Sequence, residues 1–174
     1  MVSGKVLSPP VELAKKSLQY YLENSHLLAV PEKLVPELEG RAGTFVSLKK
    51  HGELRGCIGT FQPTQESVAA EIIHNAVSAG TQDPRFFPVE LDEISELDFS
   101  VDILAAPEGI DSLQKLDPQK YGVIVRHGRR SGLLLPMLEG VDTVEEQVSI
   151  AMQKAGIRPN EEIELYRFTV TRYT

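Results

Sequence analysis

Apolar positions three or four residues apart mark two helices in the first half of the chain. The first segment follows Ser8, whose hydroxyl can cap the open amides of a helix, and runs to about Asn24. The second follows Thr64, another capping residue, and closes at Gly80, which we expect in the left-handed conformation typical of helix ends. Between them, prolines interrupt residues 26–40, so this stretch is predicted to be a connection.

A third amphipathic helix is predicted nearer the C-terminus. Thr143 and Glu146 have the spacing of a capping box, apolar residues then recur at helical intervals, and Gly156 ends the segment. The pattern therefore gives about three main helices.

Alternating apolar and polar residues predict strands, most of them in hairpins. One turn lies at residues 49–53, and a second hairpin has a six-residue connection at 127–132. Helices interspersed with such strands are typical of an α+β domain with a mixed, mainly antiparallel sheet. The predicted strands are 42–48, 54–61, 97–103, 121–126, 133–135 and 163–170.

Composition narrows the functional classes. The 174 residues, 41% of them hydrophobic, suffice for one domain with a real core. No run approaches the roughly 18 apolar residues of a membrane span, and the N-terminus lacks the pattern of a signal peptide, so we expect a cytoplasmic protein without membrane contact. A formal net charge of −7 argues against nucleic-acid binding. The basic clusters at 49–55 and 126–130 are interpreted as solvated turns.

The segment L-R-G-C-I-G, Leu54–Gly59, is the part of the chain best suited to close chemistry. It holds the single cysteine, Cys57, with Arg55 nearby and glycines that let a backbone or ligand approach. In a regular strand Arg55 and Cys57 point to the same face, so the guanidinium can stabilise a thiolate, whereas a bulge at Gly56 removes that alignment. A lone cysteine is more often a packed small hydrophobe, so both interpretations stay open.

A stiff loop between two prolines, Asp83–Pro88, is the second candidate region. Asp83 and Arg85 either orient a ligand or fix the loop through a salt bridge. His51 or His127 is the available base for a reactive thiol. One cysteine excludes an internal disulfide, and no pair of residues has the spacing of zinc ligands, so we expect neither a metal nor a cofactor.

Four motifs, in order, resemble the AMMECR-type family, also called AmmeMemoRadiSam system protein A. They are L-R-G-C-I-G at 54–59, D-P-R-F at 83–86, L-L-L-P at 133–136 and K-A-G-I at 154–157. The resemblance spans nearly the whole chain and implies a single domain over 1–174, a two-lobed α+β fold, and a cleft bordered by the first motif. It also implies a Memo-like protein and a radical S-adenosylmethionine protein as partners, while the family's own activity is unassigned. Members often carry a tryptophan after the third motif, and this chain has none.

Two hypotheses follow for the cleft. In the first, to which we give slight preference, the protein acts in an unknown modification pathway with Cys57 and Arg55 as catalytic residues. In the second, the cleft is a non-catalytic binding module for a small anionic ligand or a protein partner, and Arg55, Arg85 and the turn at 126–130 accept the anion. Both place the same residues at the ligand: Gly56, Gly59, Asp83, Arg85 and His127. Replacing Cys57 by serine separates the hypotheses, because only a thiolate enzyme loses activity by orders of magnitude.

Overall fold

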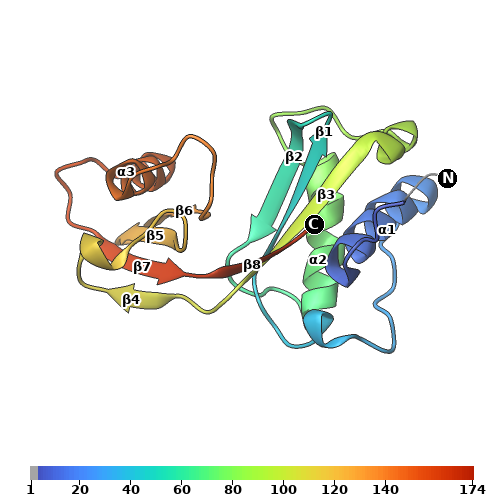
Figure 1. Cartoon of the computed structure of the whole chain (residues 1–174), viewed down its shortest axis with the longest axis horizontal. Coiled ribbons are helices and arrows are strands. Elements are labelled where there is room, and N and C mark those ends of the chain that lie inside the picture. The colour runs from blue at the N-terminus through green and yellow to red at the C-terminus, as the bar shows by residue number, and fades with distance from the viewer. Residues whose placement is uncertain (1–3) are drawn as a thin grey trace. The chain divides into compact units, whose positions relative to one another are not determined.

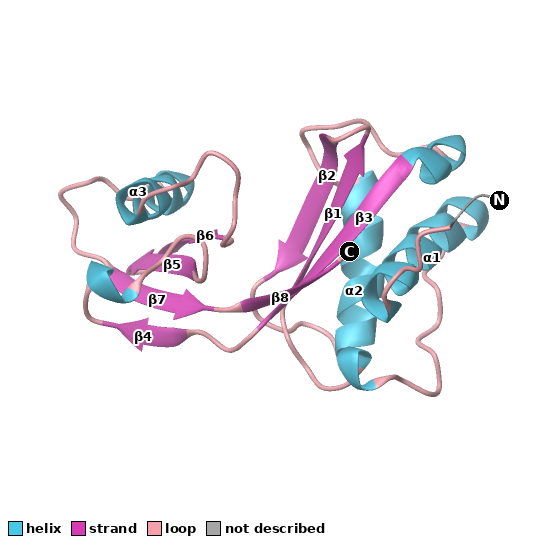
Figure 2. Ribbon diagram, viewed as in Figure 1, coloured by secondary structure: helices cyan, strands magenta, loops and turns pink. Residues whose placement is uncertain are grey.

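The computed structural model describes residues 4–174, and the chain divides into two compact units (Figure 1). The first unit comprises the described residues up to Ile103 with Thr171–Thr174, and the second is Leu104–Val170. Each unit has its own core. The two sheets and three main helices confirm the predicted α+β class (Figure 2).

The first sheet has the strand order β2-β1-β3-β8, and β1 pairs antiparallel with both β2 and β3. Two helices cover one face of it, and two short 3₁₀ turns connect the elements (Figure 1). The elements are α1 (Pro9–Asn24), η1 (Pro36–Leu38), β1 (Thr44–Lys50), β2 (Glu53–Thr60), α2 (Val68–Thr81), η2 (Leu91–Glu96), β3 (Leu97–Leu104) and β8 (Val170–Tyr173).

Alternation along the strands gives this sheet one apolar face and one polar face. Val46 and Leu48 on β1, with Phe99 and Val101 on β3, are buried against α1 and α2. Successive side chains of a strand point to opposite faces, so the residues between them lie on the other side. We call that side the polar face, and it carries Ser47, Cys57, Ser100, Asp102 and Arg172.

The second unit is a smaller sheet with the order β4-β7-β5-β6, and all three pairings are antiparallel. Helix α3 packs on β5 and β6, where Gly132 leaves no room for a side chain because a Cβ would lie 2.0 Å from the carbonyl oxygen of Ala151. The elements are β4 (Glu108–Ile110), η3 (Leu113–Lys115), β5 (Gly122–His127), β6 (Arg130–Leu134), α3 (Val144–Ala155) and β7 (Glu164–Phe168).

The helix ends differ from the predicted caps at three places. Ser8 precedes α1, but its hydroxyl donates to the carbonyl of Thr174 at 3.4 Å instead of capping the helix. Ser67, not Thr64, caps α2 by accepting from a backbone N–H. Gly80 stays helical, and its missing side chain makes room for Leu18, since a Cβ there would lie 2.5 Å from that side chain.

Two strand predictions were wrong in detail. The predicted single strand 163–170 is broken at Thr169 into β7 and β8, which belong to different sheets. The six-residue connection 127–132 is a two-residue turn, because β5 and β6 extend through His127 and Arg130, and Gly128 takes a positive φ of 61°. A short turn with glycine matches the twist of paired strands better than a long loop does.

Candidate functional site

A bulge in β2 changes the direction of Arg55. The ladder shifts register between Leu48 and Lys49, and Arg55 is the extra residue without a partner on β1. The bulge lies next to Gly56, so the regular alternation that would place Arg55 on the same face as Cys57 is not formed.

Arg55 binds the loop that follows α2. Its guanidinium donates to both carboxylate oxygens of Glu93, at 3.3 and 3.1 Å, and to the carbonyls of Phe87 and Pro88, at 2.8 and 3.4 Å. Burial works to raise the pKa of Glu93, but a backbone N–H, Arg55 and Lys50 all donate to its carboxylate and hold the pKa at about 2. The contacts of Arg55 are therefore with this loop, not with the thiol.

Asp83 and Arg85 meet β2 at Cys57. The Asp83 side chain is only 3% exposed, and its Oδ2 accepts the backbone N–H of Cys57 at 3.0 Å. Arg85 donates to the same carboxylate from Nη2 at 2.7 Å, from Nε at 3.0 Å and from its backbone N–H at 3.1 Å. The hydrogen bond from Arg85 holds the pKa of Asp83 well below its usual range, so Asp83 is ionised.

This pair also closes the edge of the first sheet. Strand β2 lies at the edge of the sheet, and the N–H and C=O of Cys57 point away from β1, as their partners show. Asp83 accepts the N–H, and Nη2 of Arg85 donates to the C=O at 3.5 Å. Unpaired backbone groups on an edge strand attract other chains, and here two side chains satisfy them.

The thiol of Cys57 lies on the polar face and is half-buried. Its Sγ is 3.2 Å from the hydroxyl oxygen of Ser47 on β1. Burial raises the pKa of Cys57, while the Ser47 contact and the charge of Arg85 oppose the rise without cancelling it. The group is therefore a neutral thiol near pH 7.

A second arginine and carboxylate pair lies on the same face. Arg172 on β8 donates from Nε and Nη2 to the two oxygens of Asp102 on β3, at 2.7 and 2.8 Å. Asp102 is buried, and its hydrogen bonds raise the pKa of Arg172. Ser47 lies opposite both Cys57 and Ser100, and Asp102 is two residues beyond Ser100, so the pair shares the face of the thiol.

Neither Asp102 nor Arg172 was among the site residues predicted from the sequence. The two residues are 70 positions apart, and the arginine lies in a strand that the sequence did not separate from β7.

The two glycines of the first motif allow close packing within the protein. A Cβ on Gly56 would lie 2.2 Å from the carbonyl oxygen of Ala79 on α2, and a Cβ on Gly59 would lie 2.3 Å from the ring of Phe45. Gly56 therefore brings β2 close to the helix. Neither position is a left-handed one.

His127 belongs to the second unit, where its ring is held by other groups. Nδ1 lies 2.5 Å from the carbonyl oxygen of Glu162, and Nε2 lies 3.8 Å from Glu161, which also binds Arg130 at 2.6 Å. These contacts join the β5–β6 hairpin to the segment before β7. Within residues 4–174, no three His, Cys, Asp or Glu side chains are grouped so as to hold a metal ion.

The comparisons with known proteins assign the family. The family model described as AMMECR1 matches residues 11–173, which covers parts of both units. The chain belongs to the AMMECR1 family. It is 51% identical to a Thermotoga maritima protein over 169 residues, which are 95% of this chain and 97% of that protein. The resemblance predicted from the four motifs is thereby confirmed.

A longer relative and a solved structure extend the comparison. A Clostridium acetobutylicum protein is also 51% identical over 167 residues, but these are 95% of this chain and only 36% of that protein. The crystal structure of an uncharacterised Pyrococcus horikoshii protein is 33% identical, covers 94% of this chain and 88% of that one, and has a TM-score of 0.86. No helix among the described residues has the length and apolar character needed to cross a membrane.

Proposed function

We propose that the anionic group of a ligand, a carboxylate or a phosphate, binds beside Cys57, between Arg85 at the edge of the first sheet and Arg172 on its polar face. The observation that carries the proposal is that each arginine is held edge-on by a buried carboxylate, Asp83 or Asp102. This is the binding-module hypothesis with changed residues: Arg85 stays, Arg172 is added, and Arg55 and the turn at 126–130 are left out because Arg55 is bound to Glu93 and the turn belongs to the second unit.

The N–H donors of Arg85 and Arg172 that have no acceptor support the proposed anion site. A guanidinium has five N–H donors, and Asp83 and Asp102 engage the Nε and Nη2 sides. Among the described residues, Nη1 of Arg85 and of Arg172 has no acceptor. A planar fork whose position is already fixed loses little entropy when it binds a carboxylate or a phosphate.

The same carboxylates limit the affinity. Each arginine is paired with one negative charge, so an incoming anion gains oriented hydrogen bonds but little net Coulomb attraction. We therefore expect a simple anion to bind with a Kd of about 1 mM, which corresponds to about 4 kcal/mol. A larger ligand gains affinity from its remaining atoms.

The state of the thiol favours binding over nucleophilic catalysis. A catalytic cysteine needs a lowered pKa, whereas burial raises that of Cys57. A neutral thiol next to the Ser47 hydroxyl offers weak polar contacts and does not repel an anion. In this proposal Cys57 is a contact residue, and its replacement by serine changes affinity only a few-fold.

The family resemblance suggests a cellular location, partners and a pathway for this site. We infer, from the resemblance alone, a cytoplasmic protein that acts with a Memo-like protein and a radical S-adenosylmethionine protein in a modification pathway. In that setting the anion would be a group on a substrate that passes between the partners.

Calorimetric titration tests the anion site. Inorganic phosphate and succinate are titrated, at constant ionic strength, into the protein, Arg172→Gln, and the control Arg158→Gln, which removes the same charge from an exposed position in the second unit. We expect saturable binding that falls at least tenfold in Arg172→Gln and is unchanged in the control. Equal binding by all three proteins, or none at 20 times the expected Kd (about 20 mM), refutes the proposal.

A further inference from the structure

Phe87 is an exposed aromatic side chain on a fixed backbone. It lies in the loop between α2 and η2, and 89% of its surface is exposed. Proline residues at 84 and 88 restrict the loop on both sides of it. An aromatic residue displayed in this way is unfavourable in water and is characteristic of interface anchors.

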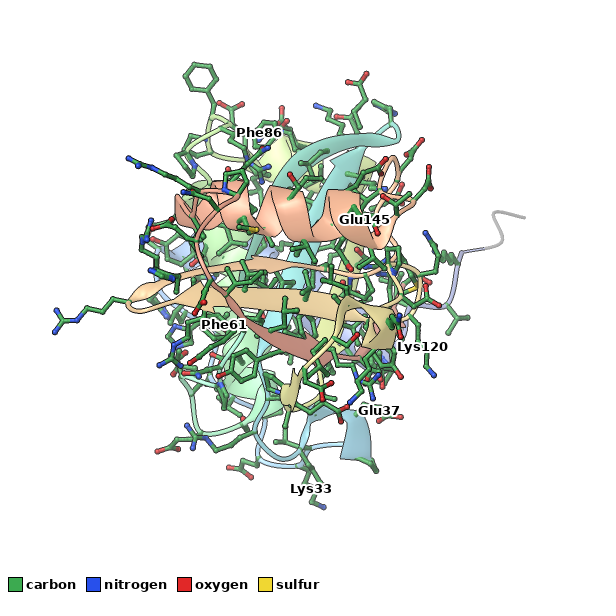
Figure 3. The ribbon with its side chains drawn as sticks, turned by 90° about the vertical axis from the view of Figure 1, so that its left-hand side faces the viewer. Lys33, Glu37, Phe61, Phe86, Lys120 and Glu145 are labelled. Carbon is green, nitrogen blue, oxygen red and sulfur yellow. The ribbon has the colours of Figure 1, made fainter. Side chains whose placement is uncertain are left out.

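The loop backbone is fixed to the rest of the first unit at several points. Arg55 binds the carbonyls of Phe87 and Pro88, and the backbone N–H of Val89 donates to the carbonyl of Gly80 at 2.7 Å. The loop passes the end of the β1–β2 hairpin (Figure 1). Before Phe87, the side chain of Phe86, labelled in Figure 3, lies under the guanidinium of Arg85, 5.4 Å from the ring centroid. Little conformational entropy remains to be lost when Phe87 is buried.

Further exposed groups around this loop define the partner's chemistry. Leu54, next to Arg55 on β2, and Leu91, at the start of η2, are exposed apolar residues. Glu90 and Asp92 flank Leu91, and neither makes an ion pair with a described residue. A complementary surface has an apolar pocket with basic residues on its rim.

The Clostridium relative indicates what this partner is. In that protein a domain 51% identical to this chain is only 36% of the whole, so roughly two-thirds of its length is additional protein attached to the same domain. In the Thermotoga relative, by contrast, the match covers 97% of the protein. Two domains that belong to one chain have a high effective concentration for each other, which favours their binding to each other.

We propose that Phe87, with Leu54 and Leu91, is the docking point for a protein equivalent to that additional part of the Clostridium relative. Phe87 fills an apolar pocket of the partner, and Glu90 and Asp92 meet basic residues at the rim. This inference does not depend on the anion site.

A chimaera tests the docking. This chain replaces the matching segment of the Clostridium protein, and hydrogen exchange of residues 85–93 is compared with the chain alone. Phe87→Ser and the control Val30→Ser, which alters a 44%-exposed residue in the connection after α1, are made in the chimaera. Neither side chain is buried, so both variants are expected to fold.

We expect amides of residues 85–93 to exchange at least tenfold more slowly in the chimaera than in the chain alone. Phe87→Ser returns them to the free rate, and Val30→Ser does not. Equal exchange with and without the attached protein, or protection that survives Phe87→Ser, overturns the proposal. If the chimaera does not fold, the natural Clostridium protein is compared with its variant at the residue aligned with Phe87, with the same two outcomes.

Discussion

Replacing Asp83 by asparagine removes the charge that holds the loop and the sheet edge together. The carboxylate accepts four hydrogen bonds, one from the Cys57 backbone and three from Arg85. The asparagine side chain keeps only one acceptor oxygen. Its NH2 group then faces at least one N–H donor, with which it cannot form a hydrogen bond. Hydrogen bonds to charged groups contribute about 1.5–3 kcal/mol each, but Arg85 is 54% exposed, so its share is reduced by solvent. We expect Asp83→Asn to lower the free energy of unfolding by about 3 kcal/mol, a factor of roughly 100 in the equilibrium.

Urea unfolding measures this change. Far-ultraviolet circular dichroism follows both units, while labelling of Cys57 by a thiol reagent reports on the first unit alone. The control is Asp111→Asn, which removes one partner of an ion pair with Lys115 at 2.8 Å on the surface, where Asp111 is 82% exposed. An ion pair this exposed contributes little to stability.

The difference between wild type and Asp83→Asn depends on pH in a defined direction. The folded-state pKa of Asp83 is below the usual value of about 3.9, so its contribution is complete above about pH 5 and is lost as the pH falls toward the folded value. The difference is therefore constant from pH 7 to about 5 and narrows below about pH 4. A loss no larger than that of Asp111→Asn, or a difference that persists undiminished at pH 3, refutes the reasoning.

Three further predictions concern the same unit. The rate of Cys57 alkylation rises with pH to a midpoint above the ordinary value of about 8.5, since burial raises the pKa of the thiol, and a midpoint below 8 contradicts this. In thermal unfolding, Gly56→Ala lowers the free energy of unfolding by about 3 kcal/mol because the added Cβ meets a helix carbonyl. Gly4→Ala, which adds a Cβ in open space, is neutral in the same measurement. Arg55→Met releases the loop after α2, so the amides of residues 85–90 exchange about tenfold faster, and unchanged exchange would show that Arg55 does not fix the loop.

Local sequence patterns predicted the helices and strands well, but they did not predict the interactions between segments far apart in the chain. The helix at Pro9–Asn24 follows from periodicity, and the end of the third helix at Gly156 follows from the residue type, both of which are read within a few residues. The division of 163–170 into two strands escaped because the apolar alternation continues across Thr169, and only the pairing partners differ. Tertiary pairing of this kind is not encoded in a short window of sequence.

The same holds for the candidate site: residues within a motif were predicted, and contacts between distant residues were not. The first motif drew attention to Cys57, whose role as a site residue stays a prediction, and the Asp83–Arg85 pair was foreseen as a salt bridge or a ligand contact. The bulge that turns Arg55 away depends on the register with β1, and the Asp102–Arg172 pair joins residues far apart in the chain. Neither could be found from spacing, because each arises only when the sheet is assembled.

The most direct test of the anion site uses the thiol inside it. Cys57 is alkylated with neutral iodoacetamide while inorganic phosphate is titrated at constant ionic strength. A bound anion covers Sγ and disfavours the thiolate, so we expect a saturable decrease in rate that is lost in Arg172→Gln and retained in Arg158→Gln. A rate that phosphate leaves unchanged, or lowers equally in both variants, would contradict binding between Arg85 and Arg172.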